Sequence, residues 1–257
     1  MFSIITVCKD CCKKLEKTIV SVLEQDYKDI EYIIIDGASK DGSLELIKSY
    51  VAKDSRIKYF SEPDEGIYDA MNKGARMASG DFYEFLNAGD TFYSNEVLSR
   101  IAEAMKKSKA DIYFGDHINC FEDGTYTIQR YPQWYAYELV YWLRDCVNHQ
   151  SIFANKDCFS DHTFDTFYQV GADRDWMIRM IKQHKKWKSL GFMVINYEVS
   201  NDSFSIMKDA EFKKELEYQA EKYYPVGAVF GDVMELIRRG KLSSKVLHAI
   251  SRRVLYR

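Results

Sequence analysis

Carboxylates stand at the ends of several strand-like segments in this sequence. Asp36 lies in IIIDGASKDGS, Glu62 and Asp64 lie in SEPDEGIYDAMNKG, and Asp90 ends FLNAGD. Carboxylates can accept a hydrogen bond from a base, hold a divalent cation or remove a proton from a hydroxyl group. Asp and Asn beside Gly also form turns and cap helices, so each segment alone has a structural interpretation. Their recurrence at successive strand ends is harder to explain in that way and predicts a binding site.

Two familiar ligand-binding loops do not fit the segment after Asp36. Gly37 and Gly42 have the spacing of a P-loop, but Ser43 stands where that motif needs Lys. An EF-hand fails because Ala38 and Lys40 occupy positions that need oxygen ligands. The loop therefore binds its ligand by another arrangement.

The elements that would position these carboxylates alternate between strand and helix patterns. Strands are predicted at 2–8, 31–36, 57–62, 82–87 and 111–116, with helices between them. This alternation implies βαβ crossovers and a parallel sheet, and ligands of such sheets bind beyond the carboxyl ends of the strands. The pattern becomes less regular up to about residue 200, and helices are expected after it.

Composition narrows the class of protein. The 257 residues are 46% apolar and 29% charged, which is typical of a soluble globular protein. The six Cys form no pair of matched clusters, so free thiols in a reducing compartment are favoured over a disulfide framework or a four-thiolate zinc site. The chain has no long uncharged apolar run and no leader-like N-terminus. We therefore expect a cytoplasmic protein.

Several motifs occur in a characteristic order along the chain. They are SIITVCKD, IIIDGASKDGS, SEPDEGIYDAMNKG, FLNAGD, and HQSIF with GADRDWMIR. In this order they resemble the family-2 glycosyltransferases of bacterial polysaccharide assembly, over roughly the first 200 residues. The resemblance implies an α/β nucleotide-diphosphosugar transferase (GT-A, Rossmann-like) fold with a mostly parallel central sheet. It also implies inverting transfer of a sugar from a nucleotide diphosphate to a glycan hydroxyl.

The resemblance also implies a division of the chain. We expect a nucleotide-sugar-binding half at 1–117 and an acceptor-binding, catalytic half of the same domain at 118–205. C-terminal helices with a basic amphipathic tail are expected at 206–257.

Donor contacts are implied for five residues. Thr6 and Asp36 match family positions that meet the base and ribose, and a carboxylate that accepts from a ring N–H suits uracil or guanine. UDP- or GDP-sugars are therefore favoured. Asn72 and Lys73 match positions that face the donor, although Lys73 could equally be a solvated surface cation. Asn87 belongs to the same nucleotide-binding set.

A divalent cation, Mg²⁺ or Mn²⁺, is implied by the match of FLNAGD to the family's D-x-D segment. Asn87 and Gly89 replace acids there, and Asp90 is the acid that remains as a metal ligand. One carboxylate can suffice when phosphates and water supply the other oxygens. The alternative is that Asp90 caps the helix that begins near Ser94.

GADRDWMIR matches the family segment that carries the general base, and Asp173 is the expected base. Asp175 is the nearest second acid, and together the two could instead cap the helix over 176–181. His149 and Trp176 are expected on the acceptor side, and His149 could also contact metal or phosphate.

Two further segments have open interpretations. RYPQWYAYELVYWLRDC, at 130–146, could be an aromatic platform for the acceptor or part of the core, and core packing is favoured. Residues 238–257 contain seven Lys or Arg and no acid, which predicts a basic amphipathic helix on an anionic membrane surface, a dimer contact or a solvated helix. The acceptor would be a glycan or a lipid-linked glycan. Nucleic acid is not expected, because the rest of the chain is acidic.

Two other classes compete with a transferase. A nucleotidyltransferase would need a glycine-rich basic loop after the first strand, and CKDCCKKLEK contains no Gly. A catalytically inactive nucleotide- or sugar-binding module would account for the aromatic residues and for the reduced D-x-D segment.

Overall fold

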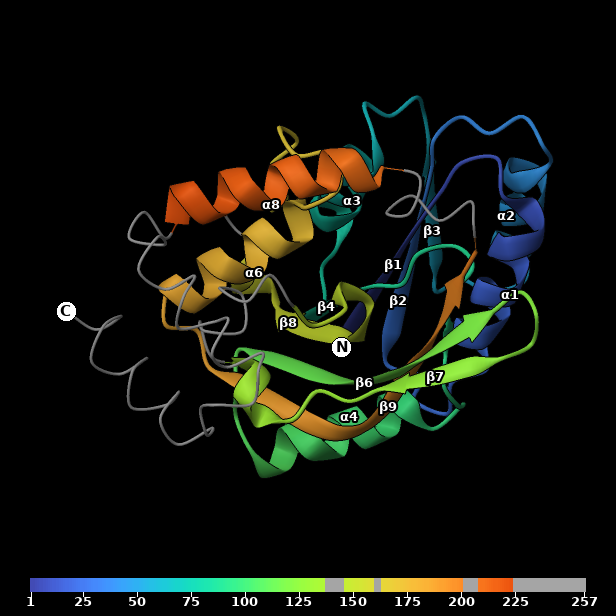
Figure 1. The fold of residues 1–257 in the computed structure, drawn as a ribbon. Coiled ribbons are helices and arrows are strands. Elements are labelled where there is room, and N and C mark those ends of the chain that lie inside the picture. The colour runs from blue at the N-terminus through green and yellow to red at the C-terminus, as the bar shows by residue number, and fades with distance from the viewer. Residues whose placement is uncertain (137–145, 160–162, 201–207, 224–257) are drawn as a thin grey trace.

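The computed structural model describes residues 1–136, 146–159, 163–200 and 208–223. Its first part alternates strands with helices as predicted (Figure 1). In chain order the elements are β1 (Phe2–Cys8), α1 (Cys12–Leu23), β2 (Ile30–Asp36), α2 (Ser43–Val51), β3 (Ile57–Ser61), α3 (Ile67–Met77), β4 (Phe82–Phe85), β5 (Thr91–Phe92) and α4 (Val97–Lys107).

The second part is more regular than the sequence pattern predicted. It contains β6 (Ile112–Phe121), β7 (Tyr126–Gln129), β8 (Ile152–Asn155), α6 (Ala172–Lys182), β9 (Trp187–Val199) and α8 (Asp209–Tyr223), with short 3₁₀ turns η1 (Gln133–Ala136), η2 (His149–Ser151) and η3 (Lys156–Cys158). The alternation of strand and helix does break after β6, as expected, but ordered strands continue through the region. Strand β9 escaped notice because WKSLGFMVINYEV mixes polar and apolar residues around Gly191, which has a φ of 71°.

The described strands form one sheet in the order β3-β2-β1-β4-β8-β6-β9-β5, and β7 pairs with the second half of β6. The strands from β3 to β4 run parallel, as does β6 with β9, whereas β8 runs antiparallel to both β4 and β6. This mostly parallel sheet with helices on both faces is the α/β architecture that the resemblance implies. Strands from both predicted halves of the chain contribute to it.

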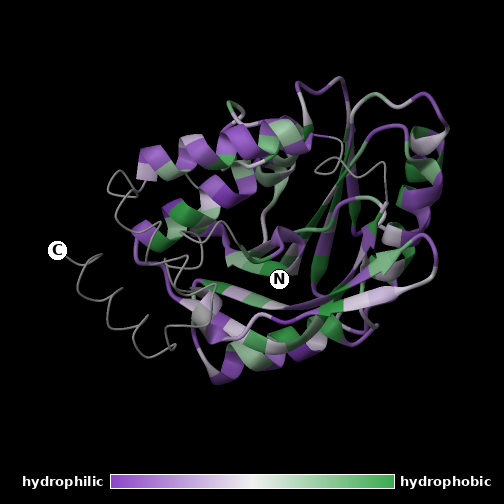
Figure 2. Cartoon of the chain, viewed as in Figure 1, coloured by the Kyte–Doolittle hydropathy of each residue, from purple (hydrophilic) through white to green (hydrophobic). Residues whose placement is uncertain are grey.

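Alternate residues of β1 and β2 face opposite layers of the core. Ile5 and Ile33 pack on the side of α3 and α6, while Ile4 and Ile34 pack on the side of α1, α2 and α4. These two fully buried strands are largely hydrophobic (Figure 2). Burial on both faces explains why the β2 sequence IEYIIID is almost unbroken in apolar residues.

Close packing of α3 on the sheet depends on one glycine. A Cβ on Gly74 would lie 2.4 Å from Cγ2 of Ile5, so a side chain there would push α3 off β1. This close packing matters because α3 carries Tyr68 to the edge of the sheet where β1 ends.

Glu31 joins four strands at the opposite edge of the sheet. Its side chain accepts hydrogen bonds from the Ser3 hydroxyl on β1 (2.6 Å) and from the Gly80 backbone N–H before β4 (3.0 Å), and Lys58 on β3 lies 2.8 Å away. Ser79 donates from both its backbone and its hydroxyl. Burial alone would raise the pKa of Glu31, but these donors, Lys58 first among them, lower it to about 2.

None of the described helices is long and apolar enough to cross a membrane.

Replacement of Glu31 tests this junction through its pH dependence. A carboxyl whose pKa falls on folding contributes stability above its unfolded pKa and loses that contribution as pH falls toward the folded value. Glu31→Gln should therefore lower the free energy of unfolding at pH 7 by roughly 2–3 kcal/mol, and the difference from the parent should shrink between about pH 4.5 and 2. Urea denaturation at pH 7 and pH 3 measures both values. Glu24→Gln, at an exposed position that ends α1, is the control, and an equal loss at both pH values would contradict the assignment.

Candidate active site

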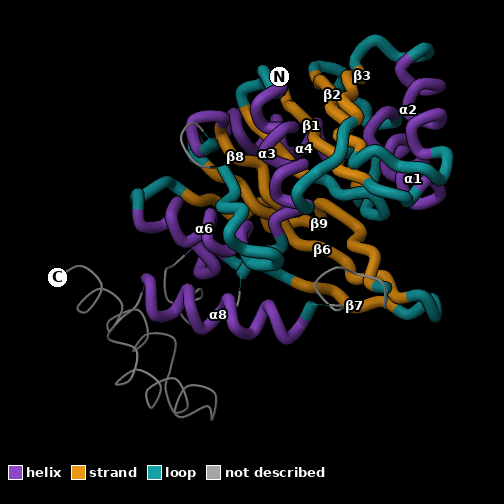
Figure 3. Tube along the Cα trace, turned by 90° about the horizontal axis from the view of Figure 1, so that it is seen from above, coloured by secondary structure: helices purple, strands orange, loops and turns teal. Residues whose placement is uncertain are grey.

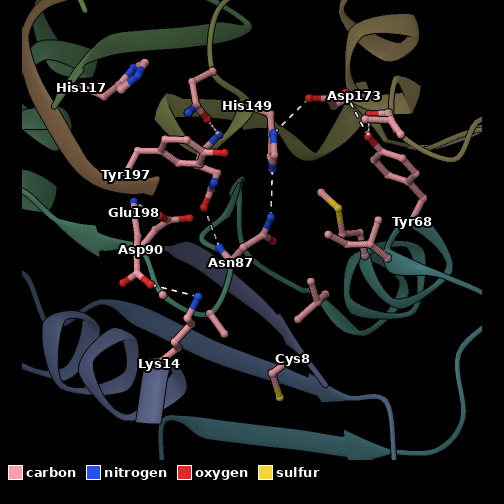
Figure 4. Close-up of a pocket in the computed structure, with 18 of the residues that line it drawn as sticks. Cys8, Lys14, Tyr68, Asn87, Asp90, His117, His149, Asp173, Tyr197 and Glu198 are labelled. Atoms are coloured by element: carbon pink, nitrogen blue, oxygen red, sulfur yellow. Dashed lines mark hydrogen bonds and ion pairs between the residues drawn. The ribbon is translucent and has the colours of Figure 1, made fainter. Parts of the chain in front are cut away.

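A cavity of about 510 Å³ opens beside the carboxyl ends of β1 and β4. Its walls come from β1, α3, the loop after β4, η2, the start of α6 and the end of β9 (Figure 4). Four predicted site residues lie in this lining, namely Asn87, Asp90, His149 and Asp173. Segments far apart in the sequence therefore converge at this edge of the sheet, but of the strand-end carboxylates only Asp90 lies in the lining, and Asp36, Glu62 and Asp64 lie outside it.

Asp173 is held by three donors in the first turn of α6. Its Oδ2 lies 3.0 Å from Nδ1 of His149, and its Oδ1 accepts from the Tyr68 hydroxyl (3.1 Å) and from the backbone N–H of Arg174 (2.8 Å). Burial works to raise the pKa of Asp173, but the hydrogen bond from His149 and those from the other two donors bring it below its ordinary value. The side chain is thus ionised at neutral pH and can accept a proton.

His149 connects this carboxylate to the loop after β4. While Nδ1 faces Asp173, Nε2 lies 3.4 Å from the side-chain nitrogen of Asn87. A neutral imidazole with its proton on Nδ1 satisfies both contacts, because it donates to Asp173 and accepts from Asn87. Gln150, the next residue, accepts a hydrogen bond from the Asn87 backbone at 2.9 Å.

Asn87 and Asp90 supply the oxygen ligands that a cation would need. Oδ1 of Asn87 is buried and makes no hydrogen bond within the described residues. Asp90 is 4% exposed, and burial raises its pKa to about 7 against the opposing influence of Gln150, His149 and two lysines. A bound cation would satisfy the free amide oxygen and favour the charged carboxylate, so this donor set fits a hard divalent ion. The described part of the chain contains no cluster of three or more His, Cys, Asp or Glu side chains suited to a metal, so most ligands would come from a substrate and water.

Positive charge at the cavity comes from α1. Nζ of Lys14 lies 3.1 Å from Glu198, and Lys17 pairs with the other oxygen of the same carboxylate. The backbone N–H of Glu198 in turn donates to Asp90 at 2.6 Å. The end of β9 therefore links the cationic face of α1 to the carboxylate of the FLNAGD loop.

Thr6 and Asp36 lie outside the cavity lining. The Thr6 hydroxyl is fully buried, donates to the Leu86 carbonyl (2.7 Å) and accepts from Tyr32 (3.0 Å), so its predicted nucleotide contact has no support from its side chain. Asp36 accepts from the backbone of Ser39 and from the hydroxyl of Ser61. This is the turn-capping role that the sequence left open, and Asp36 ends β2 one strand away from the cavity.

Asn72 and Lys73 make contacts within the protein instead of facing the cavity. The Asn72 amide exchanges two hydrogen bonds with the backbone of Phe164. Lys73 lies within 3.0 Å of three carboxylates, those of Glu62, Asp64 and Asp69. Its charge is therefore already compensated, and the expectation that it faces the donor is not supported.

Asp175 and Trp176 point away from the cavity into the protein. Asp175 is 1% exposed and binds Arg179 at 2.8 Å and the Tyr223 hydroxyl at 2.6 Å. Trp176 stacks on Phe159 and donates to the Cys158 carbonyl, so it belongs to the core. Of the two acids in GADRDWMIR, Asp173 is the one that faces the cavity.

The aromatic segment is partly described. Tyr131 and Tyr135 are buried and pack edge to face, as core packing predicts. Residues 137–145 lie outside the described residues, as does the basic tail at 238–257, so the acceptor platform and the membrane-binding helix stay predictions.

Several cavity residues were missed by the sequence analysis. Lys14, Tyr68, His117, Tyr197 and Glu198 all line the cavity. Tyr68 lies in the noted SEPDEGIYDAMNKG motif, and Lys14 in the lysine-containing segment after the first strand. The other three come from strands that carried no recognised motif.

Helix α8 holds the start of α6 in place, and the two helices lie side by side in both views (Figures 1 and 3). The carboxylate of Glu215 accepts from three consecutive backbone N–H groups, at 169, 170 and 171, over 2.6 to 3.1 Å. Gln219 donates to the Gly171 carbonyl and accepts from Arg174. The donors just before α6 are thereby satisfied by a helix about 45 residues further along the chain.

Comparison with known proteins agrees with this geometry. A family model described as Glycosyl transferase family 2 matches residues 3–173. A PGL/p-HBAD biosynthesis glycosyltransferase of Mycobacterium tuberculosis is 28% identical over 224 residues, which are 84% of this chain and 84% of that protein. An uncharacterized glycosyltransferase of Haemophilus influenzae is 35% identical over 111 residues, which cover 43% of this chain and 44% of that protein.

Solved structures share the fold. TarS of S. aureus superposes with a TM-score of 0.63 at 17% identity, over 82% of this chain and 38% of that one. TarS 1-349 in complex with UDP-GlcNAc gives a TM-score of 0.64 at 16% identity, over 77% of this chain and 58% of that one. The mannosyltransferase PcManGT of Pyrobaculum calidifontis, in complex with GDP-Man and Mn2+, gives 0.60 at 15% identity over 99% of this chain and 79% of that one.

The support that α8 gives to α6 can be measured. Glu215→Ala leaves three backbone N–H groups without their acceptor and should lower the free energy of unfolding by roughly 2 kcal/mol. Chemical denaturation measures this loss. Glu217→Ala, an exposed acid on the same helix, should stay within about 0.5 kcal/mol of the parent. Equal effects from the two substitutions would show that Glu215 does not hold the start of α6.

Proposed function

Because the chain belongs to glycosyl transferase family 2, and is thus a glycosyltransferase, we propose that it moves a sugar from a UDP- or GDP-sugar to a hydroxyl of a glycan with inversion. The observation that carries this proposal is the position of Asp173, an ionised carboxylate held at the cavity wall by His149 and Tyr68. A single base in this place suits a direct displacement.

The proposed reaction is an in-line displacement at the anomeric carbon. The acceptor hydroxyl attacks from the face opposite the nucleotide diphosphate, and Asp173 removes its proton as the new glycosidic bond forms. The bond to the diphosphate oxygen breaks in the same step, so the configuration at the anomeric carbon inverts. Fixed hydrogen bonds keep the carboxylate oriented before the acceptor arrives, which lowers the entropic cost of reaching the reactive geometry.

Donor binding is proposed at the cavity between β1 and the FLNAGD loop. Lys14 brings a cation to the cavity wall, where it can offset diphosphate charge. Asp36 is proposed to accept from the ring N–H of uracil or guanine. The nucleotide sugars named for the two solved relatives, UDP-GlcNAc and GDP-Man, carry these two bases.

The residues present fit a Mg²⁺ or Mn²⁺ ion. Asp90 and the Oδ1 atom of Asn87 would hold it, and when bound the ion would act as a Lewis acid that stabilises charge on the leaving diphosphate. Lys14 lines the same cavity and would also offset negative charge on the diphosphate.

The acceptor side is proposed as a glycan or lipid-linked glycan in bacterial surface polysaccharide synthesis. The mycobacterial relatives are named for PGL/p-HBAD biosynthesis. We place the protein in the cytoplasm, with a peripheral hold on the inner face of the membrane through residues 238–257.

A donor panel tests the proposed function. Release of UDP or GDP should occur with one nucleotide sugar, increase with Mn²⁺, and give a product of opposite anomeric configuration by NMR. Asp173→Asn should lower kcat by about 10²–10⁴-fold while nucleotide binding, measured by calorimetry, is kept. Asp175→Asn is the contrast, since loss of its contacts to α8 should lower the melting temperature. Full activity of Asp173→Asn, or a product of retained configuration, would reject the proposed mechanism.

His149 variants separate its two contacts. An Asn side chain can place an amide near the Nδ1 position that faces Asp173, whereas a Gln side chain reaches the Nε2 position that faces Asn87. His149→Asn should therefore keep most of kcat and raise the KM for the donor, and His149→Gln should lower kcat by up to about 100-fold with less effect on that KM. Steady-state kinetics gives both constants. If both variants behave like His149→Ala, the contact with Asp173 is not what His149 contributes.

A further inference from the structure

A C-x-x-C pair spans the junction between β1 and α1. Cys8 is the last residue of β1, and Cys11 occupies the N-cap position of α1. Cys8 belongs to the apolar layer on the α1 side of the sheet and Cys11 packs against that layer, and both residues line the cavity described above. Cys8 is buried at 7% exposure and Cys11 is half-buried, so an oxidant that enters the cavity meets Cys11 first.

The surroundings make Cys11 the more reactive thiol of the pair. The neighbouring Cys8 thiol is the largest cause that lowers the pKa of Cys11, and Lys14 acts in the same direction. Cys11 in turn raises the pKa of Cys8, with burial as the next cause. Cys11 also stands at the start of a twelve-residue helix, where the helix dipole stabilises a thiolate.

This pair is connected to the proposed nucleotide site. The Cys8 thiol lies 3.8 Å from Oδ1 of Asp36, to which it donates a weak hydrogen bond. Between the two Cys, the Asp10 backbone donates to the Ser39 hydroxyl, and its side chain accepts from the Lys40 backbone. The loop that carries the pair is therefore tied to the loop that follows Asp36.

A structural metal does not explain the pair, since the part of the chain that the structure describes contains no cluster of three metal-ligating side chains. A C-x-x-C sequence in the first turn of a βαβ unit is instead typical of reversible thiol chemistry.

We propose that Cys8 and Cys11 form a reversible disulfide that weakens donor binding at the adjoining cavity. With hydrogen peroxide as oxidant, the Cys11 thiolate attacks one peroxide oxygen, the O–O bond breaks, and hydroxide leaves to become water. The resulting sulfenic acid is attacked at sulfur by Cys8, which gives up its proton as the S–S bond forms and a second water leaves. Two thiols and one peroxide thus give one disulfide and two waters.

The effect on the donor follows from the lost thiol proton. Once Cys8 is in a disulfide it can no longer donate to Asp36, and its bond to Cys11 constrains the loop between β1 and α1. The effect of the disulfide on donor binding rests on the proposed function, whereas formation of the disulfide does not.

The experiment treats the purified full chain with hydrogen peroxide and then maps linked peptides by mass spectrometry. Trypsin cuts after Lys9, so a Cys8–Cys11 bond joins two peptides that are otherwise separate. Binding of UDP and GDP with Mn²⁺ is measured by calorimetry before oxidation, after it, and after reduction with dithiothreitol. We expect the linked peptides, nucleotide affinity lower by roughly tenfold or more, and recovery on reduction.

Variants identify the responsible thiols. Cys12→Ser, which changes the neighbouring residue outside the cavity lining, should keep the oxidation response. When Cys11→Ser or Cys8→Ser is added to the Cys12→Ser variant, peroxide should no longer change nucleotide affinity. Each double variant is compared before and after oxidation. Absence of a Cys8–Cys11 link, or a link without change in nucleotide affinity, overturns the proposal. If reduced protein binds neither nucleotide, the proposed function and the control of donor binding both fail, while the peptide map still decides the disulfide.

Discussion

The orientation of the first turn of α6 is the constraint on which the candidate site depends. Glu215 and Gln219 hold this turn from α8, and Tyr68 and His149 hold the carboxylate that it presents. These four partners come from three parts of the chain, α8, α3 and η2. A carboxylate fixed in this way loses little entropy when an acceptor binds, which is how rigid supporting contacts contribute to catalysis.

Charge in the cavity is arranged in two separate groups. On one side, Lys14 and Lys17 surround Glu198, whose backbone binds Asp90. On the other side, Asp173 is balanced by hydrogen bonds from His149 and Tyr68. Asn87 stands between the groups and contacts His149. A diphosphate and an acceptor hydroxyl would therefore meet different charges, as the two ends of a displacement reaction require.

The strands could be predicted because they depend on local pattern, whereas of the strand-end carboxylates Asp90 lines the cavity and Asp36, Glu62 and Asp64 do not. Apolar runs such as IEYIIID indicate buried strands, and the polar residues that follow them mark the functional edge. The directions of Thr6, Asn72 and Lys73 could not be predicted, because register and long-range partners decide where a side chain points. Lys73 shows this well, since its charge is compensated by carboxylates in the preceding loop and on its own helix. The role of Glu215 could not be predicted for the same reason, because its hydrogen bonds run from one helix to the start of another.

The late position of α8 in the chain has a consequence for biosynthesis. A ribosome releases β1 to β4, with their parallel pairing, long before it releases Glu215. The sheet and the FLNAGD loop can therefore fold while the backbone at 169–171 still lacks its acceptor. The nascent chain would acquire the geometry of the candidate site only once α8 has been synthesised, after the parallel strands have paired.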